Sequence, residues 1–292
     1  MRTTDGDVVL GLYRSRHPRD VLEAAADLGV ARIDTASNYL RHRSHEVLKT
    51  VAGDLLPKLA VSTKVGYFPG EHSLAPARLH AGVEQAVKDL GREPDTVLLH
   101  NPEHSHPDAE MLAQACAVLS DAAQTGLCGG WGVSSWDPRP LADLDAPRPD
   151  VLMVRSGLVV GADALEAAEA LVTRWRPSQV WGMSPFGGST SEAVWGKFDP
   201  RIFLRNTPPA TSAQAAFRAA YGLPRVDAVA VGTDNVDHLR ELVGALAYEV
   251  DDQVVREYRQ LLQARRQPVR SSFTTRSAVS RATPSRGSSG SA

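Results

Sequence analysis

Short apolar runs recur along the chain between residue 8 and about residue 265. Each run is six residues or shorter and is followed by a polar loop and then by an amphipathic stretch. Most runs are continuous rather than alternating, which is typical of parallel strands that are buried on both faces. The pattern predicts strands at Val8–Leu12, Ala31–Ile33, Leu59–Thr63, Thr96–Leu99, Gly129–Val133, Val151–Val154, Gln179–Met183 and Ala228–Val231.

The stretches between these runs carry helical signals. Apolar residues three and four positions apart form four stripes, which are Val21, Leu22, Ala25 and Leu28; Leu79, Val83, Val87 and Leu90; Met111, Leu112, Ala115, Leu119 and Ala122; and Val236, Leu239, Leu242, Val243 and Leu246. Pro18 opens the first of these helices, and Gly29, Gly91 and Gly126 follow the first three, where glycine commonly ends a helix. Asn235 is placed to cap the fourth helix.

Strands that alternate with helices imply a parallel sheet. Eight strands at this spacing predict an α/β protein, a closed (β/α)8 TIM barrel that forms a single domain over residues 1–265. An open doubly wound sheet is the alternative. It is disfavoured because Gly11-Leu12-Tyr13-Arg14 follows the first strand, where that fold carries G-x-G-x-x-G. Residues 266–292 are expected to form a flexible, disordered tail rich in arginine and serine, with too few apolar side chains to offset the entropy of ordering.

Composition and charge exclude several classes of protein. The 292 residues include 32 basic and 34 acidic side chains, so a formal charge of −2 offers no strong field for nucleic acid or membrane. Residues 268–292 carry four arginines and no acidic residue, which leaves −6 on the rest (−2 − 4). No apolar run is long enough to span a membrane, and the first residues lack a secretory signal. With only two cysteines, the sequence predicts a cytoplasmic protein.

Four ionisable residues stand at or just beyond the ends of three consecutive predicted strands. Asp34 follows the second strand, Lys64 the third and His100 the fourth, and Tyr39 lies in the loop after Asp34. Each residue taken alone has an ordinary structural explanation, but their chemistry is complementary. An unperturbed phenol is too weak an acid for easy proton donation, and a neighbouring ammonium lowers its pKa. A carboxylate would position the lysine and an imidazole would orient a carbonyl, so the four residues predict an acid–base centre.

These residues and their order resemble the aldo-keto reductases. Asp34-Thr35-Ala36-Ser37-Asn38-Tyr39 is similar to the family's D-T-A pattern followed by tyrosine. Lys64 matches its lysine, and His100-Asn101-Pro102 matches its H-x-P. The resemblance implies hydride transfer from a nicotinamide cofactor to an aldehyde or ketone. It also implies that Tyr39 is the general acid, that Lys64 and Asp34 tune it, and that His100 orients the carbonyl.

Three later motifs extend the resemblance to the cofactor. Gly132-Val133-Ser134-Ser135 is similar to G-V-S-N, which holds the nicotinamide carboxamide, and Met183-Ser184-Pro185-Phe186-Gly187-Gly188 is similar to a diphosphate-binding S-P-L-G loop. Val231-Gly232-Thr233-Asp234-Asn235, with the helix start after it, is similar to the segment around the adenosine phosphate. The implied cofactor-binding residues are Ser134, Ser135, Ser184, Phe186, Gly187, Gly232, Thr233, Asp234, Asn235, His238 and Glu241.

Some positions depart from the family pattern. Leu40 stands where a glycine usually follows the tyrosine, Ser135 replaces an asparagine, and Met153 and Leu242 replace residues that contact the cofactor. The resemblance implies NADPH, although the carboxylate of Asp234 would repel a 2′-phosphate and suit a ribose hydroxyl, which leaves NADH as the second candidate. The helix start near Asn235 is expected to offer free N–H groups to an anion.

The substrate is a small carbonyl compound by resemblance, with no further identity. Loops above the barrel set specificity, and the expected loops are 67–73, 101–108, 136–140 and 195–203. Tyr67, Phe68, Trp136 and Trp195 are candidate substrate contacts, with packing beneath their loops as the alternative. No metal site is expected, because neither H-E-x-x-H nor C-x-x-C occurs. The number of subunits stays open.

Two other functions remain open. A regulatory or interaction subunit that binds the nucleotide without turnover is one, although binding alone does not require the tyrosine, lysine and histidine together. An unrelated lyase or isomerase on the same barrel is the other.

Overall fold

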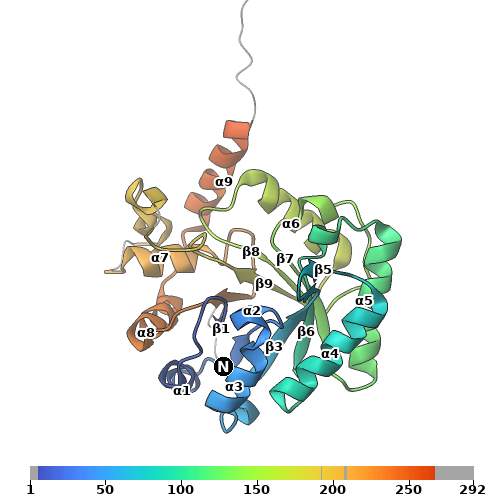
Figure 1. The fold of residues 1–292 in the computed structure, drawn as a ribbon. Coiled ribbons are helices and arrows are strands. Elements are labelled where there is room, and N and C mark those ends of the chain that lie inside the picture. The colour runs from blue at the N-terminus through green and yellow to red at the C-terminus, as the bar shows by residue number, and fades with distance from the viewer. Residues whose placement is uncertain (1–5, 192, 207–208, 267–292) are drawn as a thin grey trace, which may run out of the picture.

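The computed structural model describes residues 6–191, 193–206 and 209–266 of the chain. Its centre is a closed barrel of parallel strands with helices around it (Figure 1). The barrel strands are β1 (Asp7–Gly11), β2 (Arg32–Asp34), β3 (Ala60–Val65), β6 (Thr96–His100), β7 (Trp131–Ser135), β8 (Val151–Arg155), β9 (Gln179–Met183) and β10 (Ala228–Val231). Their order around the barrel is β1-β10-β9-β8-β7-β6-β3-β2. All eight predicted strands, and the (β/α)8 barrel, are therefore confirmed.

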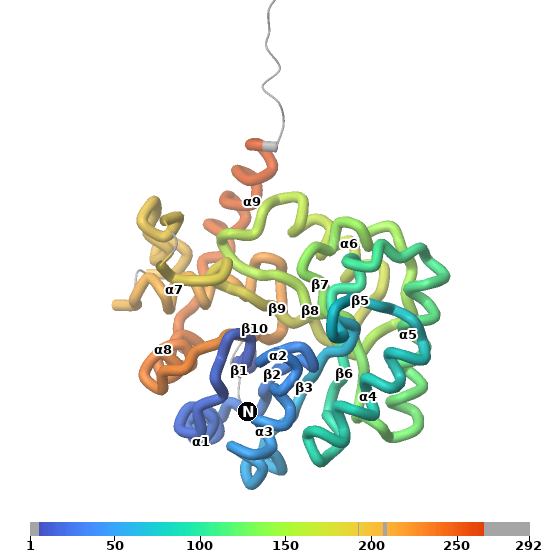
Figure 2. The backbone as a smooth tube through the Cα atoms, in the orientation of Figure 1, coloured from blue at the N-terminus to red at the C-terminus, as the bar shows by residue number. Residues whose placement is uncertain are grey.

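Helices follow the strands along the chain, and most of them cover the outside of the barrel (Figure 1). They are α1 (Arg19–Asp27), α2 (Tyr39–His42), α3 (Ser44–Ala52), α4 (Pro76–Leu90), α5 (Ala109–Gln124), α6 (Ala162–Trp175), α7 (Ser212–Ala219), α8 (Val236–Gly244) and α9 (Asp252–Arg266). Figure 2 shows the first and last barrel strands together, where Asp7 pairs with Ala228 and Leu10 with Val231. The predicted tail lies outside the described residues, except for Arg266 at the end of α9.

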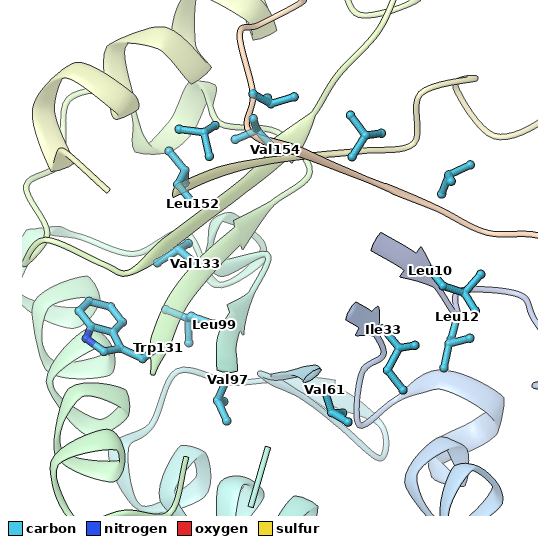
Figure 3. Packing of buried hydrophobic residues seen from close by; sticks show 14 of the residues in the cluster. Leu10, Leu12, Ile33, Val61, Val97, Leu99, Trp131, Val133, Leu152 and Val154 are labelled. Carbon is cyan, nitrogen blue, oxygen red and sulfur yellow. The ribbon is translucent and has the colours of Figure 1, made fainter. Parts of the chain in front are cut away.

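Two apolar layers stabilise the barrel. The same strands contribute to both layers, because successive side chains of a strand point to opposite faces. One layer packs between strands and helices and includes Leu10, Ile33, Val61, Val97, Leu99, Trp131, Val133, Leu152 and Val154 (Figure 3). The other fills the barrel with Val9, Leu98, Val151, Met153, Trp181, Ala228 and Ala230. The inward positions closest to the carboxyl ends of β2, β3 and β6 are therefore Asp34, Lys64 and His100.

Local signals explain most helix ends. Gly91 ends α4 at φ 72° and Gly126 follows α5 at φ 81°, backbone angles that suit glycine. Asn235 caps α8, as predicted, by accepting hydrogen bonds from the N–H groups of Asp237 and His238. The expected loop 67–73 instead contains an antiparallel hairpin of β4 (Tyr67–Phe68) and β5 (Glu71–His72). These strands are too short to show alternation in the sequence.

Candidate active site

A buried ion pair forms the base of the candidate site. The Lys64 ammonium donates to Asp34 Oδ2 and, at 2.9 Å, to the Thr35 carbonyl oxygen, and the Lys64 and Asp34 side chains are only 1% and 6% exposed. The Ser62 hydroxyl donates to the other Asp34 oxygen at 2.7 Å. Burial disfavours the ammonium, but Asp34 and Tyr39 outweigh it and raise the pKa of Lys64. Lys64 is therefore held charged at neutral pH.

Tyr39 lies over this pair at the start of α2. Its phenol oxygen accepts a hydrogen bond from Lys64 Nζ at 3.4 Å, and the ammonium lies 5.3 Å from the ring centroid. Burial raises the pKa of Tyr39, Lys64 lowers it and Asp34 raises it, with a net increase. The expected effect of Lys64 is thus present but outweighed by burial. The phenol is held protonated, which is the state a proton donor requires.

The turn after Tyr39 has an unusual backbone. Leu40 and Arg41 have φ values of 49° and 57°, in the left-handed region that favours glycine. Leu40 stands where the family pattern has glycine, so this chain adopts the glycine conformation with a leucine. The N–H of Arg43 closes the turn by donating to the Tyr39 carbonyl oxygen at 3.2 Å.

His100 faces Tyr39 from the end of β6, with ring centroids 6.1 Å apart. Burial and the Lys64 charge lower the pKa of His100 well below its usual value, so the imidazole is neutral. Its buried Nδ1 has no hydrogen-bond partner among the described residues. A neutral imidazole carries one N–H donor and one acceptor nitrogen, so His100 is able to orient a carbonyl oxygen. The four predicted residues are thus brought to one end of the barrel.

The unexpected hairpin packs beside His100. The Tyr67 ring lies edge-on to the His100 ring, 4.8 Å between centroids, and its hydroxyl bonds His104 Nδ1 at 2.6 Å. The Asn101 amide donates to the same hydroxyl at 3.2 Å, and His72 Nε2 bonds the His100 carbonyl oxygen at 2.8 Å. The hairpin therefore fixes both the ring of Tyr67 and the backbone of His100.

The four candidate substrate contacts separate into different environments. Tyr67 faces the site, whereas Phe68, its neighbour in β4, packs against the core with the Arg78 guanidinium 4.3 Å from its ring centroid. Trp136 is 41% exposed at the mouth of the barrel. Trp195 Nε1 donates to the carbonyl oxygens of Phe186 and Ser189, so it packs beneath its own loop.

Part of the expected cofactor segment lies in position beside the four residues. Ser134 pairs with His100 across β6 and β7, and Ser134 and Ser135 are both buried. The nearest partner of the Ser134 hydroxyl is the Met183 sulfur at 4.0 Å, a weak acceptor, so a ligand amide can replace it. Ser184 and Gly187, with φ values of 56° and 71°, form a tight turn after β9. These groups fit the amide and phosphate groups of a nicotinamide dinucleotide.

The loop after β10 differs from its expected state. The Asn235 side chain already accepts hydrogen bonds from two backbone N–H groups at the start of α8. The helix start was expected to offer free N–H groups to an anion, and for these two groups that expectation is wrong. Asp234 accepts from the Ser15 hydroxyl at 2.6 Å and from the Arg16 N–H at 3.1 Å. Its carboxylate therefore fastens the β1 loop to the β10 loop.

The other four residues predicted for this region differ in surroundings. Thr233 Oγ1 accepts from the Asn235 N–H at 3.1 Å, Gly232 and His238 are exposed, and Glu241 accepts from the Thr211 hydroxyl at the start of α7. Glu241 is therefore committed to a structural contact.

Two residues near the mouth were missed by the sequence reasoning. Glu103 is buried; burial raises its pKa, although the N–H groups of Trp136 and Asp137 each donate to it at 2.8 Å. Tyr13 packs on Tyr39 with ring centroids 5.2 Å apart. Their positions in loops after β6 and β1 were the only available signal.

The described ranges contain no cluster of three or more histidine, cysteine, aspartate or glutamate side chains arranged for a metal ion. None of the helices in those ranges is both long and apolar enough to cross a membrane.

The barrel and the four clustered residues define the class of protein. The model of the aldo/keto reductase family matches residues 11–159, which is half of the chain, and the chain belongs to this family. The matched segment contains all four of the clustered residues.

Two curated relatives align over part of their length. One is pyridoxine 4-dehydrogenase of Escherichia coli K12, 29% identical over 47% of this chain and 51% of the relative. The other is a putative voltage-gated potassium channel subunit beta of Schizosaccharomyces pombe, 26% identical over 42% of this chain and 38% of the relative. The chain thus spans about half, or less, of the length of these proteins.

Solved structures share the whole fold. The holo form of aldo-keto reductase AKR11C1 from Bacillus halodurans has a TM-score of 0.68 at 16% identity, covering 88% of this chain and 91% of that one. An aldo-keto reductase from Klebsiella pneumoniae in complex with NADPH has a TM-score of 0.67 at 18% identity, covering 87% and 90%. At these identities the likeness shows the fold.

Proposed function

We propose that this chain is an NADPH-dependent oxidoreductase that reduces an aldehyde or ketone to an alcohol, and that works in the cytoplasm on a small molecule. Family membership and the NADPH-bound Klebsiella neighbour support the cofactor and the class of reaction. The observation that carries the proposal is the Lys64 ammonium, which donates both to buried Asp34 and to the Tyr39 hydroxyl. Simple nucleotide binding does not require this arrangement.

When bound, the cofactor supplies the hydride, and the chain supplies binding and the proton. The substrate carbonyl oxygen lies between Tyr39 and His100. The neutral His100 imidazole donates a hydrogen bond that fixes the oxygen, and the Tyr39 hydroxyl gives its proton as negative charge develops there. Lys64 then stabilises the phenolate left behind, while Asp34 holds Lys64 in place.

The serines and loops at the mouth would hold the cofactor. Ser134 and Ser135 suit the carboxamide, and the turn at Ser184, Phe186 and Gly187 suits the diphosphate. Thr233 and His238 are the remaining candidates for the adenosine phosphate. Asp234 would disfavour that phosphate, so NADH stays the second candidate.

A turnover assay with 4-nitrobenzaldehyde tests the proposal. Wild-type protein is expected to oxidise NADPH, and Tyr39→Phe should lower kcat by about 10²–10⁴-fold, the usual contribution of a general acid. Tyr13→Phe is the matched control, because it removes a hydroxyl from the ring packed on Tyr39 and should retain most activity. NADPH binding without turnover would favour a regulatory subunit, as the likeness to a channel beta subunit suggests. No binding of NADPH or NADH would refute the reductase.

A further inference from the structure

Arg155 is a charged residue at the barrel mouth with no role in the proton-transfer site described above. It ends β8, where alternation along the strand places it on the same side as Val151 and Met153, which fill the barrel. Its side chain is half-buried. An arginine in such a place loses hydration, and a stable protein normally pairs it with a carboxylate.

The Arg155 guanidinium is held in place without being neutralised. Nε donates to the Trp136 carbonyl oxygen at 2.7 Å, and the guanidinium carbon lies 5.0 Å from the Trp136 ring centroid. In the part of the chain that the structure describes, no carboxylate lies within ion-pair distance, 4.0 Å, of its nitrogens. The terminal nitrogens, which are the bidentate edge of the fork, therefore remain available to a ligand.

The two neighbouring carboxylates accept hydrogen bonds from other groups and form no ion pair with Arg155. Asp137 accepts from Arg139 Nε at 2.8 Å and Nη2 at 2.7 Å. Glu103 accepts from backbone N–H groups. Both carboxylates act on Arg155 only at longer range, and burial is the main influence that lowers the pKa of Arg155.

Arg155 lines a cavity of about 270 Å³ at the mouth, together with Trp136, Ser184, Phe186 and Gly187. It is the charged member among the described residues of this wall. The turn after β9 lies close to the segment that follows β8, since a Cβ on Gly187 would lie 2.6 Å from a Val159 methyl. The cavity thus combines one fixed cation, one exposed indole and a glycine turn.

The same cavity is linked to the catalytic groups by direct contacts. The Trp136 N–H donates to Asn101 Oδ1 at 3.1 Å, and the Asn101 amide donates to the Tyr67 hydroxyl. Tyr67 in turn packs on His100. This series of contacts joins the wall of the cavity that holds Arg155 to His100.

We infer that Arg155 is an oxyanion-binding residue of the mouth, which takes a phosphate or carboxylate group by its free guanidinium edge. The inference rests on the proposed function, because that function supplies two sources of such a group. One is the diphosphate of the nicotinamide dinucleotide, and the other is an acidic group on the carbonyl substrate.

Two arms of one experiment distinguish the sources. Affinities for inorganic pyrophosphate, NADPH and NADH are measured by calorimetry, and kcat/KM is measured with 4-carboxybenzaldehyde and 4-nitrobenzaldehyde. Arg155→Met should lower the affinities or the kcat/KM measured in the affected arm by about 10–100-fold, as expected when a charge-assisted hydrogen bond is lost. A loss for pyrophosphate and both dinucleotides identifies the diphosphate. A loss for the carboxylate aldehyde alone identifies the substrate.

Matched variants separate a local site from charge or folding effects. Arg174→Met makes the same change in net charge at an arginine of α6 that pairs with Asp145, away from Arg155, and should leave every affinity within about twofold. Arg155→Lys should recover part of the binding, because it keeps the charge but not the fork. Thermal unfolding checks that each variant is folded. If Arg155→Met changes neither arm, or Arg174→Met changes them equally, the inference is wrong. If the wild-type protein binds neither NADPH nor NADH, the proposed reductase function is wrong instead. In that case the affinity for pyrophosphate still tests whether Arg155 binds an oxyanion.

Discussion

The buried Lys64–Asp34 pair predicts a large and specific cost for removing one partner. In Lys64→Met, the buried Asp34 carboxylate would keep the Ser62 hydroxyl but lose the ammonium that pairs with it. Leaving one charge of a buried pair uncompensated typically costs about 3–5 kcal/mol. The free energy of unfolding, measured by urea denaturation and circular dichroism, should fall by about that amount.

The double variant Lys64→Met/Asp34→Asn tests the cause of that loss. Because it removes both charges, it should be more stable than Lys64→Met, with a coupling energy of roughly 0.5–3 kcal/mol in the double-mutant cycle. A loss below about 1 kcal/mol for Lys64→Met, or strict additivity of the two substitutions, would refute the buried-pair argument.

Three further outcomes are expected. Burial lowers the pKa of His45 to about 4 from 6.5, so between these two values the unfolded chain binds a proton that the folded chain does not. The free energy of unfolding should therefore fall by about 3 kcal/mol as the pH drops from 6.5 to about 4. In His45→Gln this dependence of stability on pH should become weaker. Asp234→Asn should raise the NADPH:NADH affinity ratio about fivefold in a fluorescence titration, by removing repulsion of the 2′-phosphate. An unchanged ratio would mean that Asp234 serves only its contacts with Ser15 and Arg16. Leu40→Gly should be more stable than Leu40→Ala by about 1 kcal/mol in urea unfolding, because φ is 49°; equal stabilities would contradict backbone strain.

The barrel could be predicted because its signals are local. Each strand is a short apolar run, and helix ends are marked by residues such as Gly91 and Asn235, whose backbone or side-chain role depends on a few neighbours. Asp34, Lys64 and His100 could be placed together because parallel strands bring their carboxyl ends to one mouth. Their order in the sequence was sufficient for that step.

Properties that depend on three-dimensional surroundings could not be predicted in the same way. The net pKa of Tyr39 depends on how much burial outweighs Lys64, and burial is not visible in a motif. Tyr67 and Phe68 are adjacent, yet only the hairpin decides which one faces His100. Likewise, the availability of Arg155 depends on which distant groups its neighbours already bind.

The pairing of β1 with β10 has a consequence for how the chain reaches its native state. Asp34, Tyr39, Lys64 and His100 all lie within the first 100 of the 292 residues, but β1 finds its second neighbour only when residues 228–231 have been synthesised. Ring closure over so many residues is a contact of very high sequence separation, which slows folding. A nascent chain that already carries every reacting group is therefore expected to remain open at one edge, and to become an enzyme only in the last step of its assembly.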